Sequence, residues 1–297
     1  AARWLPEPME ITTIEQAVRR HVRDGQTVYL AGFTHLIPFS FGHELIRQGY
    51  RGLTVGRATP DLICDQMIAA GVVRRLIFSY AGNPGVGLLR CFRRAVEAGA
   101  LELEEYSHFE LIARLQAGAA GLPFWPILTE ENDLTRRRRR PSVRSPFGGE
   151  LVPVVPPLRP DVTMLHAHLA DEAGNVYAWG LLGEVREAAL AASKVLVSVE
   201  EMRPAAELRR ERDHLLLPGF RVDTVSVEPW GAHPSYVQGR YDRDQDFYSE
   251  WDRLTRDPEA VAGWLRRFVH GVPDRSRYLD LLEPGLLRSL QQRAADG

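Results

Sequence analysis

Residues 12–121 alternate between strand-like and helix-like patterns, and this alternation limits the chain to few folds. The predicted strands cover residues 26–32, 53–58, 73–82 and 101–106, and the predicted helices cover 12–25, 41–49, 60–71, 88–100 and 108–121. Strands that alternate with helices at this spacing are typical of a parallel sheet covered by helices. We therefore predict an α/β fold, with an open, mostly parallel sheet and helices on both faces.

The stretch 122–160 interrupts this pattern. It is rich in proline and contains five consecutive arginines, Arg136–Arg140, so we predict an irregular surface excursion here. The α/β pattern then resumes, with strands expected at 161–170, 194–202 and 221–229 and helices at 183–193, 260–271 and 282–297. We treat residues 1–297 as a single domain with a helical tail from about residue 256.

The composition excludes several classes of function. The 297 residues are 44% hydrophobic and carry a net charge of −2, which gives no electrostatic reason to expect nucleic acid or an anionic membrane as a partner. No stretch approaches the roughly 18 apolar residues that a spanning helix needs. No signal peptide is visible, and we expect a cytoplasmic protein. Lys194 is the only lysine, which excludes a P-loop and argues against Schiff-base chemistry.

The two cysteines, Cys64 and Cys91, form neither a disulfide framework nor a C-x-x-C site. We expect both to be buried, reduced, small apolar residues.

Three loops follow predicted strands, after Gly32, Ala58 and Tyr80, and ligands in parallel sheets bind beyond such carboxyl ends. In "AGFTHLIP" (31–38), Gly32 can expose backbone amides to an anionic or thioester oxygen. The alternative is a close-packed turn that buries Phe33. The loop "SYAGNPGVG" (79–87) also fits either a turn or a ligand-binding backbone.

His108 lies in the first turn of a predicted helix, at the same edge of the sheet. Ser107 and Glu110 have the spacing of a capping box, which accounts for that segment structurally. His108 is nevertheless placed where a site is expected.

Other motifs have simpler explanations. His166 and His168 share one face of a strand with Asp171 nearby, but no third ligand follows at a recognised spacing, so we expect buried histidines and no metal. Glu131-Asn132 lacks a following glycine and is not interpreted as a nucleophile. Arg136–Arg140 fits a solvated loop, with a contact to a polyphosphate as the alternative.

Several stretches together resemble the alpha subunits of family I coenzyme A transferases, in particular the glutaconate CoA-transferase type. The resemblance covers roughly residues 10 to 270, in the family's order. It is carried by "AGFTHLIP" (31–38), "DLICDQMIAAG" (61–71), "AGNPGVG" (81–87), "FRRAVEAGALELEEYSH" (92–108) and "PFGGELVPVVPPLRPDVTMLHAHLADEAGNV" (146–176).

The resemblance implies an enzyme that moves CoA between an acyl-CoA and a carboxylic acid through a glutamyl-CoA intermediate. Its glutamate lies in a beta subunit, within a Ser-Glu-Asn-Gly-like motif that this sequence lacks. We therefore expect no catalytic residue in this chain, no permanently bound cofactor, and no activity without the partner. The residues expected to line the cleft for acyl-CoA are Gly32, Phe33, Thr34, Tyr80, Gly82, Asn83 and His108.

Two alternatives stay open. Related CoA-dependent ring-opening hydrolases carry an active-site glutamate near the position aligned with His108, and Glu105 is a candidate equivalent. A non-catalytic module that binds acyl-CoA or a sugar phosphate is the alternative from another class. The acyl group, the acceptor acid and the oligomeric state do not follow from the sequence.

Overall fold

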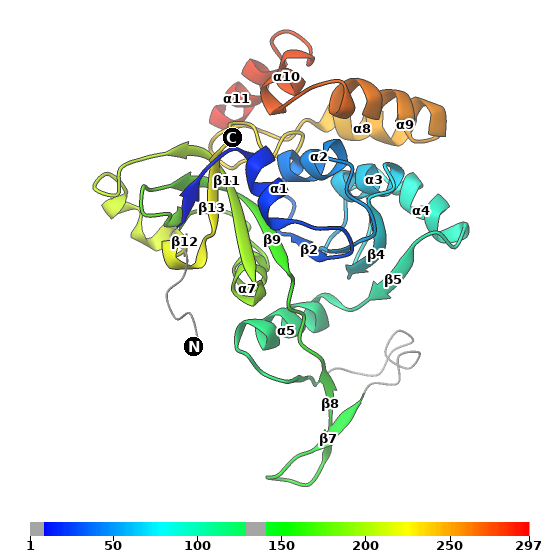
Figure 1. The fold of residues 1–297 in the computed structure, drawn as a ribbon, viewed down its shortest axis with the longest axis vertical. Helices are drawn as coiled ribbons and strands as arrows, with labels where there is room; N and C mark the ends of the chain where they lie inside the picture. Colours follow the sequence, from blue (N-terminus) through cyan, green and yellow to red (C-terminus); the bar gives the residue numbers. More distant parts are fainter. Residues whose placement is uncertain (1–8, 129–140, 297) are drawn as a thin grey trace.

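The computed structural model describes residues 9–128 and 141–296, and it is built around one large sheet (Figure 1). The parallel strands of this sheet follow in the spatial order β1 (Glu10–Ile11), β13 (Thr224–Val227), β11 (Lys194–Met202), β9 (Val162–Ala170), β2 (Thr27–Leu30), β3 (Leu53–Gly56), β4 (Val73–Phe78) and β5 (Glu102–Glu105). The short strands β10 (Val176–Tyr177) and β12 (Leu215–Leu217) extend it in the antiparallel sense.

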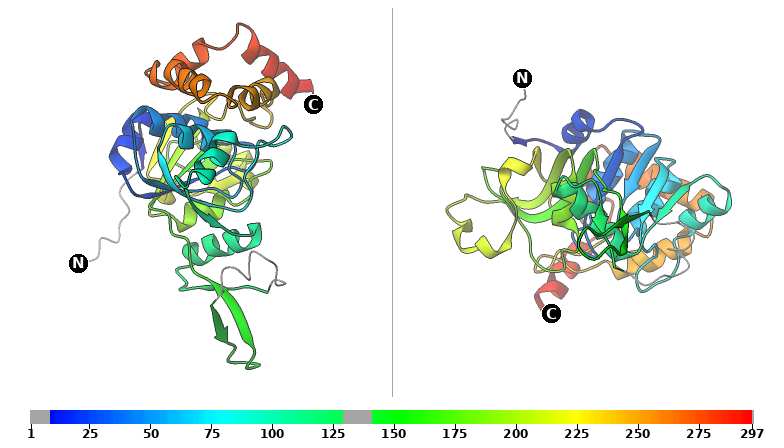
Figure 2. Two further views of the ribbon diagram at one scale, coloured as in Figure 1. Left: turned by 90° about the vertical axis from the view of Figure 1, so that its right-hand side faces the viewer. Right: turned by 90° about the horizontal axis from the view of Figure 1, so that it is seen from below.

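Helices cover both faces of the sheet (Figure 2). One face carries α1 (Ile14–His21), α2 (Phe39–Arg47), α3 (Leu62–Ala69) and α4 (Arg90–Glu97), and the other carries α5 (His108–Ala119) and α7 (Val185–Ala191). A further layer contains α8 (Gln245–Leu254), α9 (Pro258–Leu265), α10 (Arg275–Asp280) and α11 (Leu286–Asp296) (Figure 1). The predicted α/β architecture is therefore confirmed.

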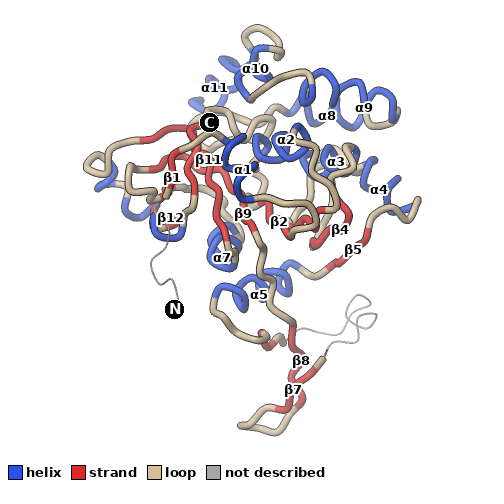
Figure 3. Tube along the Cα trace, viewed as in Figure 1, coloured by secondary structure: helices blue, strands red, loops and turns tan. Residues whose placement is uncertain are grey.

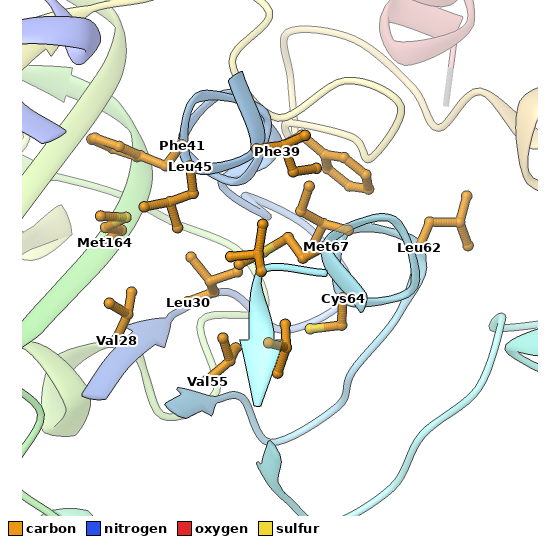
Figure 4. Close-up of a cluster of buried hydrophobic side chains, with 14 of the residues drawn as sticks. Val28, Leu30, Phe39, Phe41, Leu45, Val55, Leu62, Cys64, Met67 and Met164 are labelled. Atoms are coloured by element: carbon orange, nitrogen blue, oxygen red, sulfur yellow. The ribbon is translucent and has the colours of Figure 1, made fainter. Parts of the chain in front are cut away.

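The alternation of side chains along β2 explains why two cores form. Val28 and Leu30 point to the face of α1 to α4, whereas Tyr29 points to the face of α5 and α7. Figure 4 shows Val28 and Leu30 among aliphatic and aromatic side chains of α2 and α3. Each fully buried side chain of this kind stabilises the fold by roughly 1.5–3 kcal/mol.

The excursion after α5 differs from the irregular structure that we predicted. Its described part contains a three-stranded antiparallel sheet of β6 (Trp125–Pro126), β8 (Leu151–Val155) and β7 (Ser142–Arg144). We call the projecting β7–β8 hairpin the arm; it extends away from the large sheet (Figure 3). Residues 129–140, which include Glu131-Asn132 and Arg136–Arg140, lie outside the described residues.

The helical tail begins before residue 256, because α8 starts at Gln245. The helix expected at 260–271 consists of α9 followed by a π-helical turn, Arg266–His270. Short 3-10 turns at Leu208–Arg210, Arg212–His214 and Gly219–Arg221 complete the described helical structure.

The carboxyl edge of the sheet is stepped. Leu30, the last residue of β2, is in register with Met164 of β9, and residues 165–170 of β9 continue past it. Strand β11 runs alongside β9 through Met202. The loop after β2 therefore lies beside the two longest strands rather than level with their ends.

Candidate functional site

The loop after β2, residues 31–38, has backbone dihedral angles that most amino acids disfavour. Gly32 has a φ of 133°, and a Cβ placed on it would lie 2.7 Å from the carbonyl oxygen of Leu36. Thr34 and Leu36 have positive φ values of 63° and 53°. Non-glycine residues in this region are uncommon and are concentrated at functional sites.

A segment two hundred residues later holds this loop in place. The Ser235 hydroxyl donates to the Thr34 carbonyl at 3.0 Å, and the Leu36 N–H donates to the Tyr236 carbonyl at 3.1 Å. The hydroxyls of Thr34 and Tyr236 lie 3.3 Å apart. The strained conformation is thus fixed from outside the loop, and no local sequence signal indicated Ser235 or Tyr236.

Phe33, His108 and Gly183 meet at one place, which we call the edge corner. The rings of Phe33 and His108 are 6.2 Å apart and nearly perpendicular. A Cβ on Gly183 would lie 2.6 Å from the Cβ of Phe33, so the segment before α7 approaches as closely as a glycine allows. The edge corner therefore joins elements that follow β2, β5 and β10.

The position of His108 is fixed by the start of α5. Ser107 accepts a hydrogen bond from the Glu110 N–H, and the Glu110 carboxylate accepts one from the Ser107 N–H, which confirms the predicted capping box. His108 Nε2 is buried and has no hydrogen-bond partner among the described residues. Such an atom needs an explanation, and a ligand that bonds to it would provide one.

The other predicted site residues lie in the loop after β4, and they differ in their surroundings. The Tyr80 side chain is 57% exposed and its hydroxyl lies against Gly82. Asn83 is buried, and its side-chain amide donates to the Tyr248 carbonyl of α8 at 2.8 Å. Asn83 therefore anchors its loop to α8, whereas Tyr80 presents an aromatic face to solvent.

Buried polar side chains pair with one another in the interior next to the edge corner. The sequence did not indicate these pairs. The Tyr29 hydroxyl donates to Glu184 at 2.9 Å, and burial raises the pKa of Tyr29. Arg57 pairs with Asp61 at 2.9 Å and donates to the Leu30 carbonyl at 3.0 Å. Glu184 is only 2% exposed, so this carboxylate lies beneath the surface of the corner.

A histidine stack lies next to the strained loop. His35 stacks on Tyr236, with ring centroids 5.0 Å apart, and His168 stacks on Trp179 at 3.6 Å. Burial lowers the pKa of His35 to about 4 and that of His168 to about 3. Both imidazoles are therefore neutral near pH 7.

His166 belongs to a different network, although it shares a strand face with His168. It bonds to the Ser198 hydroxyl at 2.8 Å and to Glu200 at 2.7 Å. Glu200 also accepts from the Trp230 N–H and the Tyr241 hydroxyl. As expected, both histidines are buried, and His166 ties the loop after β13 to the sheet.

Cys64 and Cys91 are free and buried, as predicted. Burial raises the pKa of the Cys64 thiol to about 12, so this thiol is protonated and a poor nucleophile.

Two further findings concern residues 9–128 and 141–296 only. In these ranges, no cluster of three or more His, Cys, Asp or Glu side chains is suited to holding a metal ion. No helix there is long and apolar enough to cross a membrane.

Comparison with known proteins gives consistent matches along the chain. A family model described as coenzyme A transferase matches residues 11–228. The A-type subunit of the 3-oxoadipate CoA-transferase of Pseudomonas knackmussii is 45% identical over 275 residues, which cover 91% of this chain and 96% of that protein.

Solved structures agree with these sequence matches. The glutaconate coenzyme A-transferase of Acidaminococcus fermentans superimposes with a TM-score of 0.89 at 31% identity, covering 95% of each chain. A variant of the decarboxylase AibA/AibB gives a TM-score of 0.79 at 31% identity, covering 88% of this chain and 98% of the other. The same architecture therefore occurs in proteins with different reactions.

Proposed function

The chain belongs to the coenzyme A transferase family, and we propose that it is the A-type subunit of an enzyme that moves CoA between an acyl-CoA and a carboxylic acid. The observation that carries this proposal is the 45% identity to the A-type subunit of a 3-oxoadipate CoA-transferase over nearly the full length of both chains. We further propose that the partner is a B-type subunit and that the acceptor is a 3-oxo dicarboxylic acid. These finer assignments follow from the similarity to that subunit of a 3-oxoadipate CoA-transferase.

The proposed reaction uses a glutamate carboxylate of the partner as the nucleophile. It attacks the thioester carbonyl, forms an acyl-glutamyl anhydride and releases CoA as a thiolate. The thiolate then attacks the glutamyl carbonyl, which gives a glutamyl-CoA thioester and the free acid. The incoming acid then attacks the glutamyl-CoA thioester and the steps run in reverse, which gives the new acyl-CoA and restores the free glutamate. CoA is therefore part of the substrate and not a permanently bound cofactor.

This chain would contribute the walls of the thioester cleft. Backbone N–H groups of the loop at Gly32 and Thr34 can donate to an oxygen on which negative charge develops. The Phe33 ring restricts water near a reactive anhydride. The unpartnered Nε2 of His108 can bond to a polar group of the bound substrate.

The proposal is tested by co-expressing the chain with a B-type partner and supplying an acyl-CoA together with 3-oxoadipate. We expect a new thioester with the pair and none with this chain alone. Borohydride reduction in the presence of acyl-CoA should modify a glutamate of the partner. A covalent adduct on this chain, or full activity of this chain alone, would contradict the division of roles.

Acceptor dependence separates the transferase from the ring-opening hydrolase. A transferase forms the second thioester only when the acceptor acid is present, whereas a ring-opening hydrolase adds water across a ring bond of its acyl-CoA and needs no acceptor. Conversion of a cyclic acyl-CoA into an opened acyl-CoA that carries one added water, in the absence of acceptor, would favour the hydrolase. Tight acyl-CoA binding by the assembled pair without any turnover would favour the non-catalytic module.

Phe33→Ala tests the role of the edge corner in the assembled enzyme. We expect kcat/KM to fall by about tenfold or more, which corresponds to about 1.4 kcal/mol of lost transition-state stabilisation. Phe220→Ala is the matched control, because Phe220 is 71% exposed and lies in the turn before β13. Equal kinetics for the two variants would remove Phe33 from the cleft.

A further inference from the structure

A cavity lies on the opposite face of the sheet from the edge corner. Its volume is about 520 Å³, and it is bounded by the β1–α1 connection, the start of α2, the end of β13 and the start of α10. In Figure 1, α1, α2 and β13 lie beneath the layer of C-terminal helices that contains α10. The edge corner, by contrast, lies towards α5 and α7, so the two places do not share walls.

Arg275 supplies a buried positive charge to this cavity. It is 4% exposed, and the Glu228 carboxyl in the same wall interacts with it electrostatically, although no ion pair joins the two side chains. The guanidinium donates to the Trp230 carbonyl at 2.8 Å, to the His233 carbonyl, and to His43 Nδ1 at 3.2 Å. When Glu228 is protonated, no ionised carboxylate balances this buried cation, so an anion in the cavity would be stabilised here.

Two other groups in the cavity wall lack partners within the described part of the chain. Ser40 is 4% exposed, and its hydroxyl makes no hydrogen bond. The Glu228 side chain makes no hydrogen bond to the described residues either, but it interacts electrostatically with Arg275; burial raises the pKa of its carboxyl to about 7. Both lie at one turn, because the Ser40 N–H donates to the Gly231 carbonyl and the Gly231 N–H donates to the Glu228 carbonyl.

We propose that this cavity binds a small, singly charged carboxylate. One Arg275 Nη1 hydrogen is not used by the contacts described above, and it can donate to a carboxylate oxygen together with the Ser40 hydroxyl. Ile11 and Val227 line the cavity and can cover a short alkyl chain. The ligand class is therefore a short-chain aliphatic acid.

The remaining charges of the wall favour a monoanion over a phosphate or a dicarboxylate. Glu44 is already paired with Arg47, and Asp274 caps α10 by accepting from the Arg277 N–H. A second negative charge on the ligand would face these carboxylates without a free cation to balance it.

Protonation of Glu228 adds a pH dependence. Below pH 7 the carboxyl is protonated and can donate to the ligand, whereas above pH 7 its charge repels the ligand. Binding should therefore be up to about tenfold tighter at pH 6 than at pH 8. The titratable and charged groups that face Glu228 across the cavity are Glu15, His43, Glu44, Arg47, Asp274 and Arg275.

Calorimetric titration of the full-length chain with butyrate tests the site, with succinate and inorganic phosphate as comparisons. We expect butyrate to bind most tightly, Ser40→Ala to weaken binding by about fivefold or more, and Glu228→Gln to bind equally at pH 6 and pH 8. Melting temperatures of both variants show that they fold. In the complex with a B-type partner, neither variant should change the rate of CoA exchange.

The proposal would be overturned if butyrate failed to bind, or if both variants bound it as the wild type does at both pH values. Stronger binding of phosphate than of butyrate would also overturn it. His108→Ala is the matched control, since it lies in the edge corner and should leave butyrate binding unchanged. Loss of CoA exchange in the wild-type complex would contradict the proposed function and leave this result intact.

Discussion

Gly32 is the residue on which the loop after β2 depends most. Its φ of 133° disfavours any side chain, and a Cβ would press against the backbone oxygen of Leu36, which cannot rotate away. We expect Gly32→Ala to lower the free energy of unfolding by about 2–3 kcal/mol, measured by urea denaturation.

Gly25→Ala separates the two causes of this loss. Gly25 also has a positive φ, 79°, but nothing lies within 4 Å of a Cβ placed there. Only conformational strain remains, so the loss should be about 1 kcal/mol. Equal losses at the two positions would show that the contact with Leu36 has no energetic effect.

The buried histidines His35 and His168 should make stability depend on pH. Their folded-state pKa values, about 4 and about 3, lie below the unfolded value of 6.5 because burial disfavours the charged imidazole. Their stabilising contribution to the free energy of unfolding is therefore complete above pH 6.5 and is lost as the pH falls from 6.5 towards 4. Each histidine adds a slope of up to about 1.4 kcal/mol per pH unit in this window.

Urea denaturation at several pH values between 7.5 and 5 measures this slope. His35→Gln should reduce it, whatever its effect on stability at pH 7.5. His270→Gln is the control, because His270 is exposed in the π-helical turn after α9. A slope that is unchanged by His35→Gln would contradict the assignment.

At the scale of single elements, the capping box of α5 offers a direct test. Ser107→Ala removes the side-chain acceptor of the Glu110 N–H, so we expect a loss of about 1 kcal/mol in unfolding free energy. Ser107→Thr keeps a hydroxyl that accepts from the Glu110 N–H and donates to the Glu110 carboxylate, and it should lose much less. Similar losses for both variants would mean that the cap does not determine the stability of α5.

The elements that the sequence predicted correctly share one property: their patterns are long enough to repeat. Helix α5 and strand β9 show clear periodicity and were both expected at nearly their observed bounds. Strands β1 and β10 contain two residues each and have no period to detect. They form because a neighbouring strand supplies hydrogen-bond partners, which is a tertiary effect.

The arm is a larger example of structure that the sequence pattern did not predict. Pro153 lies within β8, where the pattern argued against a strand. The hairpin tolerates it because β8 is part of a small sheet with short neighbours, β6 and β7.

At the scale of the whole molecule, the arm should be stabilised at its base and not at its tip. Val155 is buried against the core that contains α5, whereas Phe147 at the tip is 99% exposed. We expect Val155→Ala to cost on the order of 2 kcal/mol, and Phe147→Ser to change the unfolding free energy by less than about 0.5 kcal/mol. Urea denaturation of the isolated chain measures both. A large loss for Phe147→Ser would show that the tip contacts the body.

For the candidate site, the sequence could indicate only those residues whose place follows from the order of strands and helices. Phe33 follows β2 and His108 follows β5 of the same parallel sheet, so both were expected at its carboxyl edge; β3 and β4 lie between these strands, and the contact of the two rings was not foreseen. Gly183, Ser235 and Tyr236 arrive from the distant half of the chain, and their contacts depend on how α7 and the segment after β13 pack. Asn83 was expected at the cleft, and the structure shows its amide bonded to α8.

The stepped edge of the sheet has a consequence for the stiffness of the β2 loop. Residues 165–170 of β9 extend roughly 20 Å beyond the end of β2, at about 3.3 Å per residue, and all of them are buried. On that flank the loop therefore rests against a packed strand and not against water. Its shape is held by the body of the protein before any ligand arrives, and a molecule that reaches the loop has to come from a side that β9 does not occupy.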